Sequence, residues 1–336
     1  MDKQSDDPSP SKSDSSGNVL VLDLPGYIKP DLQDFLLTDI TAKELRVIAE
    51  ARMTSSWGSE DYPSLYDRHT RHMMSAYIRD ALLLANLIPS SSIPSNKKLL
   101  DMACGTGALT FEANRLGIPD VTSTDFAQGM LDKLIEKAAQ ASPPIHVQTV
   151  LDDGLTLSKF EDASFDAVCS SFGIFLFEDR IAGFKSAARV LKPGGTFVTT
   201  SWVPQKGLMG YNSEIFRRAG LPLPTVVDPT KNATLSAQGF LDEVKSIAMF
   251  ENVHVYRVSH ELVLLKGSHL LDIYEKNPVF ATYVQELGGR DKLACVLANI
   301  TSEEKGKLFN AQDFINAPFQ TTTECFICVA TRLKTF

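Results

Sequence analysis

Hydrophobic and polar positions alternate between two patterns in residues 97–203. Short apolar runs, typical of buried strands, are separated by stretches in which apolar residues recur three or four positions apart, as on one face of a helix. The predicted strands are 98–103, 120–125, 145–151, 165–172 and 196–202, and the predicted helices are 107–116, 128–139 and 179–191. This alternation predicts βαβ units and a doubly wound, mostly parallel α/β sheet.

The pattern is looser on both sides of this core. Residues 62–87 carry apolar side chains at helical spacing and predict a helical lid, and the irregular stretch that begins at Val203 predicts an inserted helical cap. The first residues are rich in serine and aspartate and predict a disordered tail. The predicted regions are a disordered tail (1–17), an N-terminal helical lid segment (18–96), a core (97–203), a helical cap (204–250) and a C-terminal part of the sheet with helices (251–336).

The overall composition is that of a soluble globular protein. Of 336 residues, 43% are hydrophobic and 22% are charged, and the formal net charge is −8. The acidic balance argues against a nucleic-acid partner, and no apolar run reaches the ~18–20 residues of a membrane span. The polar N-terminus has no signal-peptide pattern, so we predict a cytoplasmic location.

The five cysteines predict free thiols, because their number is odd and no secretory signal precedes them. The pair in "CFIC" (325–328) has the spacing of a metal or redox motif, but the surrounding "TTECFICVATRL" predicts a strand. Residues three apart on a strand point to opposite faces. We therefore expect two buried structural cysteines and no metal site.

The stretch "KKLLDMACGTGALTFEA" (97–113) combines an apolar run, a turn with Gly105 and Gly107, and the start of a helix. A dinucleotide-binding turn has the pattern G-x-G-x-x-G, but Thr110 stands at the third glycine position. The turn alone therefore leaves two interpretations open: a nucleotide-cofactor site and a purely structural strand-to-helix turn.

Acidic residues end the next two predicted strands. Asp125 lies 20 residues after Gly105, where a carboxylate can accept hydrogen bonds from both hydroxyls of a ribose; its alternative role is to cap the following helix. "DDG" (152–154) ends the third strand, where a carboxylate and backbone N–H groups can bind an adenine edge. Ligands of open α/β sheets bind outside the carboxyl ends of the strands, so these features together predict a nucleoside site.

Four motifs, in order over about residues 97–203, resemble the class I (Rossmann-like) S-adenosylmethionine-dependent methyltransferase family. "LLDMACGTG" is similar to its first motif, "TDFAQGML" to its second, "LDDGLTLSKFEDASFDAVCSSFG" to its third and fourth, and "RVLKPGG" to the signature before strand five. Ala103 stands where many members have a glycine, and Gly154 where an alanine is more usual. The resemblance implies a seven-stranded, mostly parallel sheet that binds S-adenosyl-L-methionine and releases S-adenosyl-L-homocysteine.

The resemblance also implies roles for residues of these motifs. Asp101 would orient the turn and the methionine amine, and the small residues of the turn would let the backbone approach the cofactor. The implied cofactor contacts are Asp101, Ala103, Cys104, Gly105, Gly107 and Ser170 at the methionine end, Asp125 at the ribose, Phe126 and Met130 beside the adenine, and Asp153 and Gly154, with Asp152 as the register alternative, at the adenine edge.

Candidates for the acceptor side lie outside these contacts. In "WGSEDYPSLYDRHTRHMM", Tyr66 is predicted to cover the methionine end, because an aromatic residue of this segment covers the cofactor in related enzymes. His69 is the candidate general base, and a surface or helix-packing histidine is the alternative. Trp57, Phe172 and Trp202 are predicted to line an aromatic acceptor pocket, with Trp202 as a plain core residue the alternative.

The predicted function is transfer of a methyl group to an O, N, S or C nucleophile of a small molecule, such as a specialised metabolite or quinone-like compound. The alternatives are a macromolecular methyltransferase, an NAD(P)-dependent reductase, and a methyltransferase-like protein with altered or lost transfer chemistry. Thr110 and "RVLKPGG" argue against the reductase, the acidic charge against a macromolecular substrate, and the intact acidic positions against a dead site. The identity of the acceptor and the oligomeric state stay open.

Overall fold

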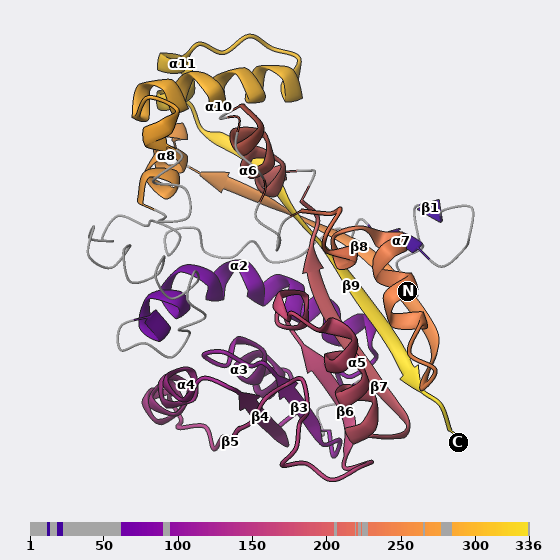
Figure 1. Cartoon of the computed structure of the whole chain (residues 1–336). Coiled ribbons are helices and arrows are strands. Elements are labelled where there is room, and N and C mark those ends of the chain that lie inside the picture. Colours follow the sequence, from indigo (N-terminus) through magenta and orange to yellow (C-terminus); the bar gives the residue numbers. More distant parts are fainter. Residues whose placement is uncertain are drawn as a thin grey trace, which may run out of the picture.

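The described residues form one nine-stranded mixed sheet in a computed structural model of the chain (Figure 1). The structure describes residues 12–13, 19–22, 62–89, 95–204, 207–218, 220, 223, 228–264, 266–276 and 284–334. The strands are β1 (Lys12–Ser13), β2 (Val19–Leu22), β3 (Leu99–Met102), β4 (Val121–Asp125), β5 (Gln148–Leu151), β6 (Phe165–Ser170), β7 (Leu191–Trp202), β8 (Phe250–Leu264) and β9 (Phe319–Arg332). Their order across the sheet is β1-β2-β8-β9-β7-β6-β3-β4-β5.

Strands β3 to β9 confirm the predicted doubly wound, mostly parallel sheet. β5, β4, β3, β6 and β7 pair in parallel, whereas β9 runs antiparallel to both of its neighbours, β7 and β8. The sequence did not predict β1 and β2, which extend the sheet beyond β8. β2 pairs in parallel with β8 and β1 pairs antiparallel with β2, so Lys12–Ser13 belongs to the sheet although it lies in the segment assigned to the tail.

Helices cover both faces of the sheet. On one face, α2 and α3 pack through Tyr77, Ile78 and Leu109, so the apolar positions at helical spacing in α2 face the core as predicted. On the other face, α5 and α7 pack through Phe184 and Phe240. The described helices are α2 (Tyr62–Leu84), α3 (Ala108–Arg115), α4 (Gln128–Gln140), α5 (Arg180–Val190), α6 (Gly207–Arg218), α7 (Ala237–Lys245), α8 (Gly267–Lys276), α10 (Arg290–Lys305) and α11 (Ala311–Asn316), with short 3₁₀ helices η2 (Ile174–Leu176) and η4 (Ala233–Leu235).

A helical lobe stands at the far end of the long β8–β9 pair, beyond the carboxyl edge of the sheet (Figure 1). Its helices, α6, α8, α10 and α11, surround a separate apolar cluster that includes Tyr211, Leu297 and Phe319. The lobe therefore comes from two segments of the chain, whereas the sequence assigned the cap to residues 204–250. The helix α7 lies within that assigned range but packs onto the sheet, because its apolar face, with Phe240, completes the core.

The "CFIC" motif lies in β9, as predicted. Cys325 packs in the cluster on the α2 side of the sheet and Cys328 in the cluster on the α5 side, so the two thiols point to opposite faces. Both are buried, and burial raises the pKa of each thiol. Among the described helices, none has the length and apolar character needed to cross a membrane.

Candidate active site at the carboxyl edge of the sheet

The turn between β3 and α3 holds three residues in the left-handed region of backbone conformation. Ala103, Gly105 and Gly107 have φ angles of 55°, 52° and 84°. Glycine adopts this region without strain, whereas a residue with a side chain, such as Ala103, is strained there by about 1–3 kcal/mol. Strain of this kind clusters at ligand sites, and turns of this kind present backbone N–H groups to a ligand.

Two strand ends approach each other closely beside this turn. A Cβ atom built on Gly173, after β6, would lie 2.8 Å from the Cβ of Ala103 and 2.6 Å from the Oγ of Ser170. Ser170 is buried, and its Oγ accepts a hydrogen bond from the N–H of Ile174 at 3.2 Å. Ser170 therefore holds the loop after β6 against the turn after β3, next to the predicted methionine end of the site.

Asp101, near the end of β3, fixes the start of α3. Its buried Oδ2 accepts hydrogen bonds from the N–H (3.0 Å) and the Oγ1 (2.6 Å) of Thr110, and that Oγ1 also contacts the Oγ of Ser123 at 2.7 Å. Burial raises the pKa of Asp101 from 3.8 to about 7, and the bonds from Thr110 oppose this rise. Thr110, which stands where a dinucleotide-binding turn has its third glycine, is thus the hydrogen-bond partner of Asp101.

Cys104 and Gly107 face a small apolar cluster on α4. The side chain of Cys104 packs with Leu131 and Leu134, and burial raises the pKa of its thiol well above the ordinary value. A Cβ atom on Gly107 would lie only 2.7 Å from the Cδ1 of Leu134. What these two residues offer to a ligand at the edge is therefore their backbone.

Asp125 ends β4 with its carboxylate beside the same turn. Its Oδ2 accepts a hydrogen bond from the N–H of Gly105 (2.8 Å), and its Oδ1 accepts one from the N–H of Ala127 (3.0 Å). Burial raises the pKa of Asp125, and these hydrogen bonds oppose the rise. Each carboxylate oxygen has a second acceptor site, so Asp125 can support the turn and still accept two ribose hydroxyls.

The two residues predicted beside the adenine lie in different surroundings. Phe126 follows Asp125 and leaves 52% of its surface exposed, which is unusual for a large apolar side chain in this protein. Met130 is buried within α4. Phe126 is therefore the side chain that can lie against a flat ring, and Met130 supports the helix behind it.

The neighbouring carboxylates Asp152 and Asp153, after β5, differ in accessibility. Asp152 is buried, and its carboxylate accepts hydrogen bonds from the N–H of Asp153 (2.9 Å), the Oγ of Ser158 (3.1 Å) and the N–H of Lys159 (2.8 Å). Asp153 is exposed, and its Oδ1 accepts one bond from the N–H of Leu155 at 2.9 Å. The carboxylate of Asp152 is therefore hydrogen-bonded within its own loop, whereas the carboxylate of Asp153 is accessible to a ligand.

Gly154 has no room for a side chain. A Cβ atom there would lie 2.7 Å from the ring of Phe177 and 3.2 Å from the Cε of Met102. Its carbonyl accepts a hydrogen bond from the Oγ of Ser186, on α5, at 2.6 Å. The alanine that is more usual at this position would displace Phe177, and glycine avoids this clash.

A partly buried ion pair ties α2 to the glycine turn. The carboxylate of Asp67 pairs with the ammonium of Lys137 on α4 and accepts a hydrogen bond from the Oγ1 of Thr106 at 2.9 Å. The Lys137 ammonium also donates to the carbonyl of Thr106 at 2.9 Å. Thr106 is the residue between the two glycines, so helix α2 holds the turn in place. The sequence did not single out these residues, because no local spacing connects them.

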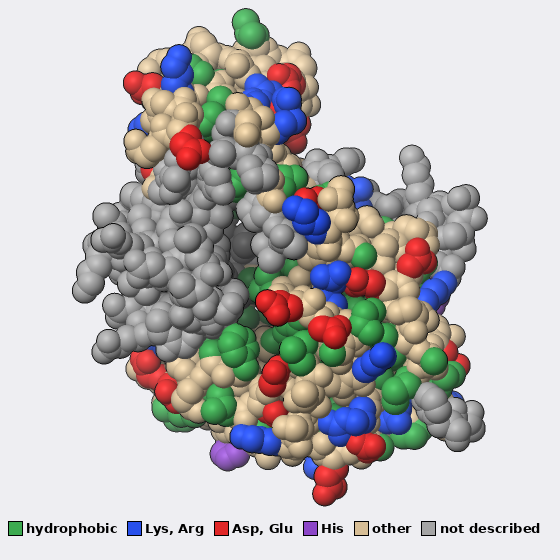
Figure 2. Space-filling model, in the orientation of Figure 1, with side chains coloured by type: hydrophobic (Ala, Val, Ile, Leu, Met, Phe, Trp, Pro, Cys, Tyr) green, Lys and Arg blue, Asp and Glu red, His purple; other side chains and the backbone are tan. Residues whose placement is uncertain are grey.

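The predicted acceptor residues Phe172 and Trp202 stack on each other. Their ring centroids lie 4.1 Å apart with an interplanar angle of 23°, and Tyr77 of α2 meets both rings edge-on at 6.0 and 5.8 Å. Phe172 has a φ of 52° and donates its N–H to the Oγ1 of Thr200 at 2.8 Å. Both rings are buried, so Trp202 is also part of the core. Figure 2 shows the surface hollowed between the helical lobe and the core, beside hydrophobic side chains.

A histidine and an aspartate extend this aromatic group. The ring of His260, on β8, contacts the ring of Tyr77 at 4.7 Å, and its Nε2 lies 2.6 Å from the Oδ2 of Asp80 on α2. Asp80 is fully buried, and 18% of the His260 side chain is exposed. No local spacing predicts this pair, because its members are 180 residues apart.

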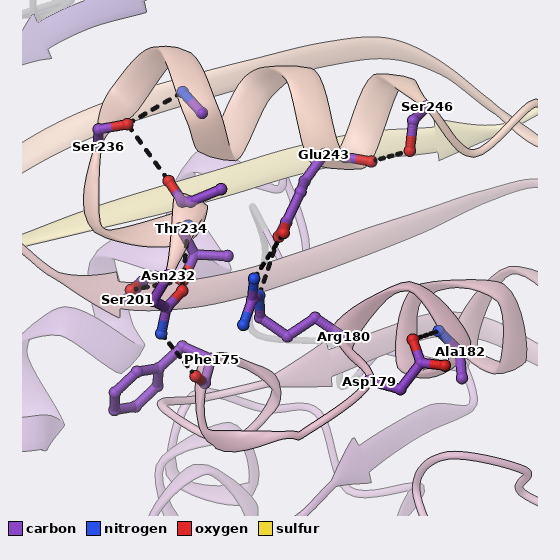
Figure 3. Close-up of polar contacts among 12 residues, drawn as sticks. Phe175, Asp179, Arg180, Ala182, Ser201, Asn232, Thr234, Ser236, Glu243 and Ser246 are labelled. Atoms are coloured by element: carbon purple, nitrogen blue, oxygen red, sulfur yellow. Dashed lines mark hydrogen bonds and ion pairs between the residues drawn. The ribbon is translucent and has the colours of Figure 1, made fainter. Parts of the chain in front are cut away.

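A second buried polar network holds the loop after β6 from the other side (Figure 3). Asn232 donates its Nδ2 to the carbonyl of Phe175 at 2.9 Å and accepts hydrogen bonds from the N–H and Oγ1 of Thr234. The hydroxyl of Thr234 in turn contacts that of Ser201 on β7 at 3.2 Å. The loop that carries Phe172 is therefore fixed to the strand that carries Trp202.

Three predicted residues of the N-terminal segment have no described side chain. Trp57 lies outside the described residues. Tyr66 and His69 lie in α2, but their side chains are outside the described part of the structure. Their roles, cofactor cover for Tyr66, general base for His69 and acceptor contact for Trp57, stay predictions.

Comparison with known proteins connects this edge to methyl transfer. A family model described as a methyltransferase domain matches residues 100–199. The demethylmenaquinone methyltransferase of Corynebacterium kroppenstedtii is 41% identical over 99 residues, which are 30% of this chain and 39% of that protein. The demethylmenaquinone methyltransferase of Staphylococcus aureus is 40% identical over 103 residues, 30% of this chain and 41% of that protein. The chain thus spans about two fifths of these curated relatives.

A solved structure shares the fold over a longer stretch. The YcgJ protein of Bacillus subtilis matches with a TM-score of 0.51 at 14% identity, covering 76% of this chain and 99% of that one. At this identity the similarity speaks for the fold alone.

Proposed function

We propose that the protein transfers a methyl group to a small molecule. The basis is that residues 100–199 belong to the class I S-adenosylmethionine-dependent methyltransferase family. S-adenosylmethionine is the methyl donor of this family. The observation that carries the proposal is the carboxyl edge of the sheet, where Asp101, Asp125 and Asp153 lie at or just after the ends of neighbouring strands around a left-handed glycine turn. This donor set suits a ligand with an amine at one end and a nucleoside at the other.

The residues present fit the two ends of such a cofactor. At the methionine end, the buried Asp101 supplies a negative charge for an ammonium, and the backbone of the turn from Ala103 to Gly107 can come close. At the nucleoside end, Asp125 would accept the ribose hydroxyls and the exposed ring of Phe126 would cover the adenine. We assign the adenine amino group to Asp153, because the carboxylate of Asp152 is taken up by its own loop.

The chemistry asks the protein mainly for alignment. The cofactor supplies an electrophilic methyl carbon on a sulfonium, and the acceptor must approach in line with the carbon–sulfur bond. Holding two reactants in such a geometry can account for about 7–11 kcal/mol of the barrier. The close packing of Gly173 against Ala103 and the buried stack of Phe172 on Trp202 give this edge rigid walls.

For the acceptor we propose a flat, apolar small molecule, a specialised metabolite or quinone-like compound. Two observations support this class: the stacked rings of Phe172 and Trp202, and the names of the curated relatives, which methylate demethylmenaquinone. The net charge of −8 makes nucleic acid a poor partner. We also infer a cytoplasmic location, because all five cysteines are free thiols.

The proposal is tested in two steps. Isothermal titration with S-adenosylhomocysteine should show saturable binding at micromolar or lower Kd, and the same titration with NADPH should show none; the reverse result would refute the cofactor assignment. A product-mass screen with methyl-labelled donor, run on reduced naphthoquinones, phenols, amines and thiols, then identifies the acceptor class. Labelling only of added protein or RNA would refute a small-molecule acceptor.

A further inference from the structure

The pair of His260 and Asp80 lies at the acceptor side of the carboxyl edge. In the register of the sheet, His260 pairs with Thr323 and Trp202 pairs with Cys325, so His260 stands two positions beyond the end of β7, towards the helical lobe. Tyr77 joins the two sides, since its ring contacts Phe172, Trp202 and His260, and its hydroxyl donates to the Oγ1 of Thr323 at 2.6 Å. His260 therefore borders the aromatic wall assigned to the acceptor.

The burial of the two groups differs in a way that a proton acceptor requires. Asp80 is fully buried, and its Oδ1 has no hydrogen-bond partner among the described residues, whereas its Oδ2 lies against Nε2 of His260. His260 keeps 18% of its side chain exposed. A buried carboxylate is costly unless it is paired, and an imidazolium at His260 would supply the pair.

The contact also fixes which nitrogen of the imidazole can act as a base. Nε2 faces the carboxylate of Asp80, so in the neutral ring the proton is held there, as an N–H donated to Oδ2. The lone pair is then on Nδ1. A carboxylate that orients an imidazole and stabilises its protonated form is the arrangement found behind histidine bases in other enzyme classes.

A third polar atom on this face supports a polar ligand group there. Thr321 lies two residues before Thr323 on β9 and faces the same side of the sheet. Its Oγ1 is buried and, among the described residues, has no hydrogen-bond partner. A hydroxyl of a bound ligand, flanked by apolar rings, would meet both Thr321 and His260.

We propose, resting on the function assigned above, that the acceptor carries a phenolic hydroxyl and that His260, oriented by Asp80, accepts its proton. The phenolic O–H bond breaks, the proton goes to Nδ1 of His260, and the electron pair stays on the acceptor. The phenolate oxygen then forms a bond to the methyl carbon; where the ring carbon beside it forms this bond instead, that carbon afterwards loses its own hydrogen as a proton to water. The bond from that carbon to sulfur breaks with its electrons on sulfur, and the imidazolium returns its proton to water. In this scheme His260 touches the substrate and Asp80 is a positioning residue.

Three other titratable groups near His260, those of Tyr77, Cys325 and Glu324, are neutral at neutral pH or point elsewhere. Burial raises the pKa of Tyr77 on α2 and of Cys325 on β9 well above their ordinary values. Glu324 alternates to the opposite face of β9 and pairs with Arg257 on β8. Among the described residues, His260 and its partner Asp80 are thus the polar pair that borders the aromatic wall.

The test uses 4-nitrophenol, whose absorbance reports its ionisation, on the full chain saturated with S-adenosylhomocysteine. In the wild-type protein, the bound phenol should ionise at a pH about 1 unit below that of free 4-nitrophenol, because the imidazolium stabilises the phenolate. His260→Asn should remove this shift and leave the Kd of S-adenosylhomocysteine unchanged within twofold. Asp80→Asn should reduce the shift in the same way, which a purely structural role for Asp80 would not do.

The matched control is His254→Asn, on the same face of β8 at the other end of the strand, which should keep the wild-type shift. An equal shift in His260→Asn and wild type, or no binding of 4-nitrophenol to the cofactor-saturated protein, would overturn the inference while the methyltransferase function stands. If S-adenosylhomocysteine itself fails to bind the wild-type protein, the proposed function falls and this inference falls with it.

Discussion

The proposed cofactor side and the proposed acceptor side of the carboxyl edge are built in different ways. On the cofactor side, contacts join residues close in sequence: Asp101 binds Thr110, nine residues on, and Asp125 binds Gly105, twenty residues back. On the acceptor side, Tyr77 meets His260 and bonds to Thr323, 246 residues away. The contacts of the first side follow from short separations in the sequence, whereas those of the second form only when the sheet has formed.

The two sides also differ in whether backbone conformation or side-chain packing forms the site. The cofactor side depends on left-handed backbone at Ala103, Gly105 and Gly107, where a side chain is either strained or excluded. The acceptor side depends on buried rings, which are also core residues. A change on the cofactor side should therefore act mainly on ligand affinity, and a change on the acceptor side on both stability and turnover.

The largest effect is expected from Trp202→Ala. Removing a buried ring that stacks on Phe172 leaves a cavity, so the free energy of unfolding should fall by about 3–5 kcal/mol. Urea denaturation measures this loss. S-adenosylhomocysteine affinity of the folded protein should stay within about twofold, because Trp202 lies outside the cofactor side.

Phe126→Ala should have the opposite profile, with a small change in stability and a loss of cofactor affinity. Its ring is 52% exposed, so stability should change by no more than about 0.5 kcal/mol, whereas S-adenosylhomocysteine affinity should fall. If the two aromatic variants had the same profile, the division between the two sides would be wrong.

The sequence groups the residues of the proposed cofactor side for a physical reason. A strand, a glycine turn and a helix have fixed lengths, so the spacing from Asp101 to Asp125 determines where their carboxylates meet. It could not decide between Asp152 and Asp153, since adjacent residues at a strand end differ only by which one the loop turns inward. Which of the two carboxylates turns inward depends on how the loop folds.

The residues of the proposed acceptor side are only partly accessible to sequence reasoning. Phe172 could be named because it follows β6 and Trp202 because it ends β7, and the structure stacks their rings. His260 and Asp80 could not be named, because pairing across 180 residues depends on how α2 crosses the sheet. The cap at residues 204–250 stays a prediction for a similar reason: a helical pattern in α7 does not reveal whether its apolar face meets a lobe or the sheet, where the structure places it.

The second largest effect is expected from Gly107→Ala, for which the chain offers a matched control in Gly117→Ala. Both glycines have a φ of 84°, but a Cβ on Gly107 would overlap Leu134 at 2.7 Å, whereas one on Gly117 would meet Pro89 at an ordinary 3.5 Å. We expect a loss of about 2–4 kcal/mol for Gly107→Ala and about 1–2 kcal/mol for Gly117→Ala. Thermal unfolding measures both losses, and titration should show weaker S-adenosylhomocysteine binding for Gly107→Ala alone. Equal losses would mean that backbone conformation, and not packing on α4, decides the cost.

A smaller effect is expected from Asp125→Ala. The ribose hydroxyls and the N–H of Gly105 would lose their acceptor, so S-adenosylhomocysteine should bind about 1–3 kcal/mol more weakly, or roughly 5- to 150-fold. Asp152→Ala is the control, because this carboxylate supports only its own loop and should alter stability more than affinity. Unchanged affinity in Asp125→Ala would place the ribose elsewhere.

The smallest effect concerns the pH dependence of binding and tests Asp101. Burial raises its pKa from 3.8 to about 7, so in the unliganded protein Asp101 gains a proton as the pH falls through 7. If its charge holds the methionine ammonium, S-adenosylhomocysteine affinity should fall roughly tenfold from pH 8 to pH 6. Asp101→Asn should bind weakly with a flat profile over this range.

The sign of the stability change separates this effect from unfolding. For a carboxyl group whose pKa is raised in the folded state, stability is fully present below the unfolded pKa of 3.8 and is lost as the pH rises through about 7. Lowering the pH from 8 to 6 therefore makes the Asp101 contribution to folding more favourable while cofactor binding weakens. Parallel titrations and melts at both pH values should show these opposite trends. If affinity and stability fell together in the wild-type protein, the loss of binding would come from other groups, and Asp101 would support the turn without holding the ligand.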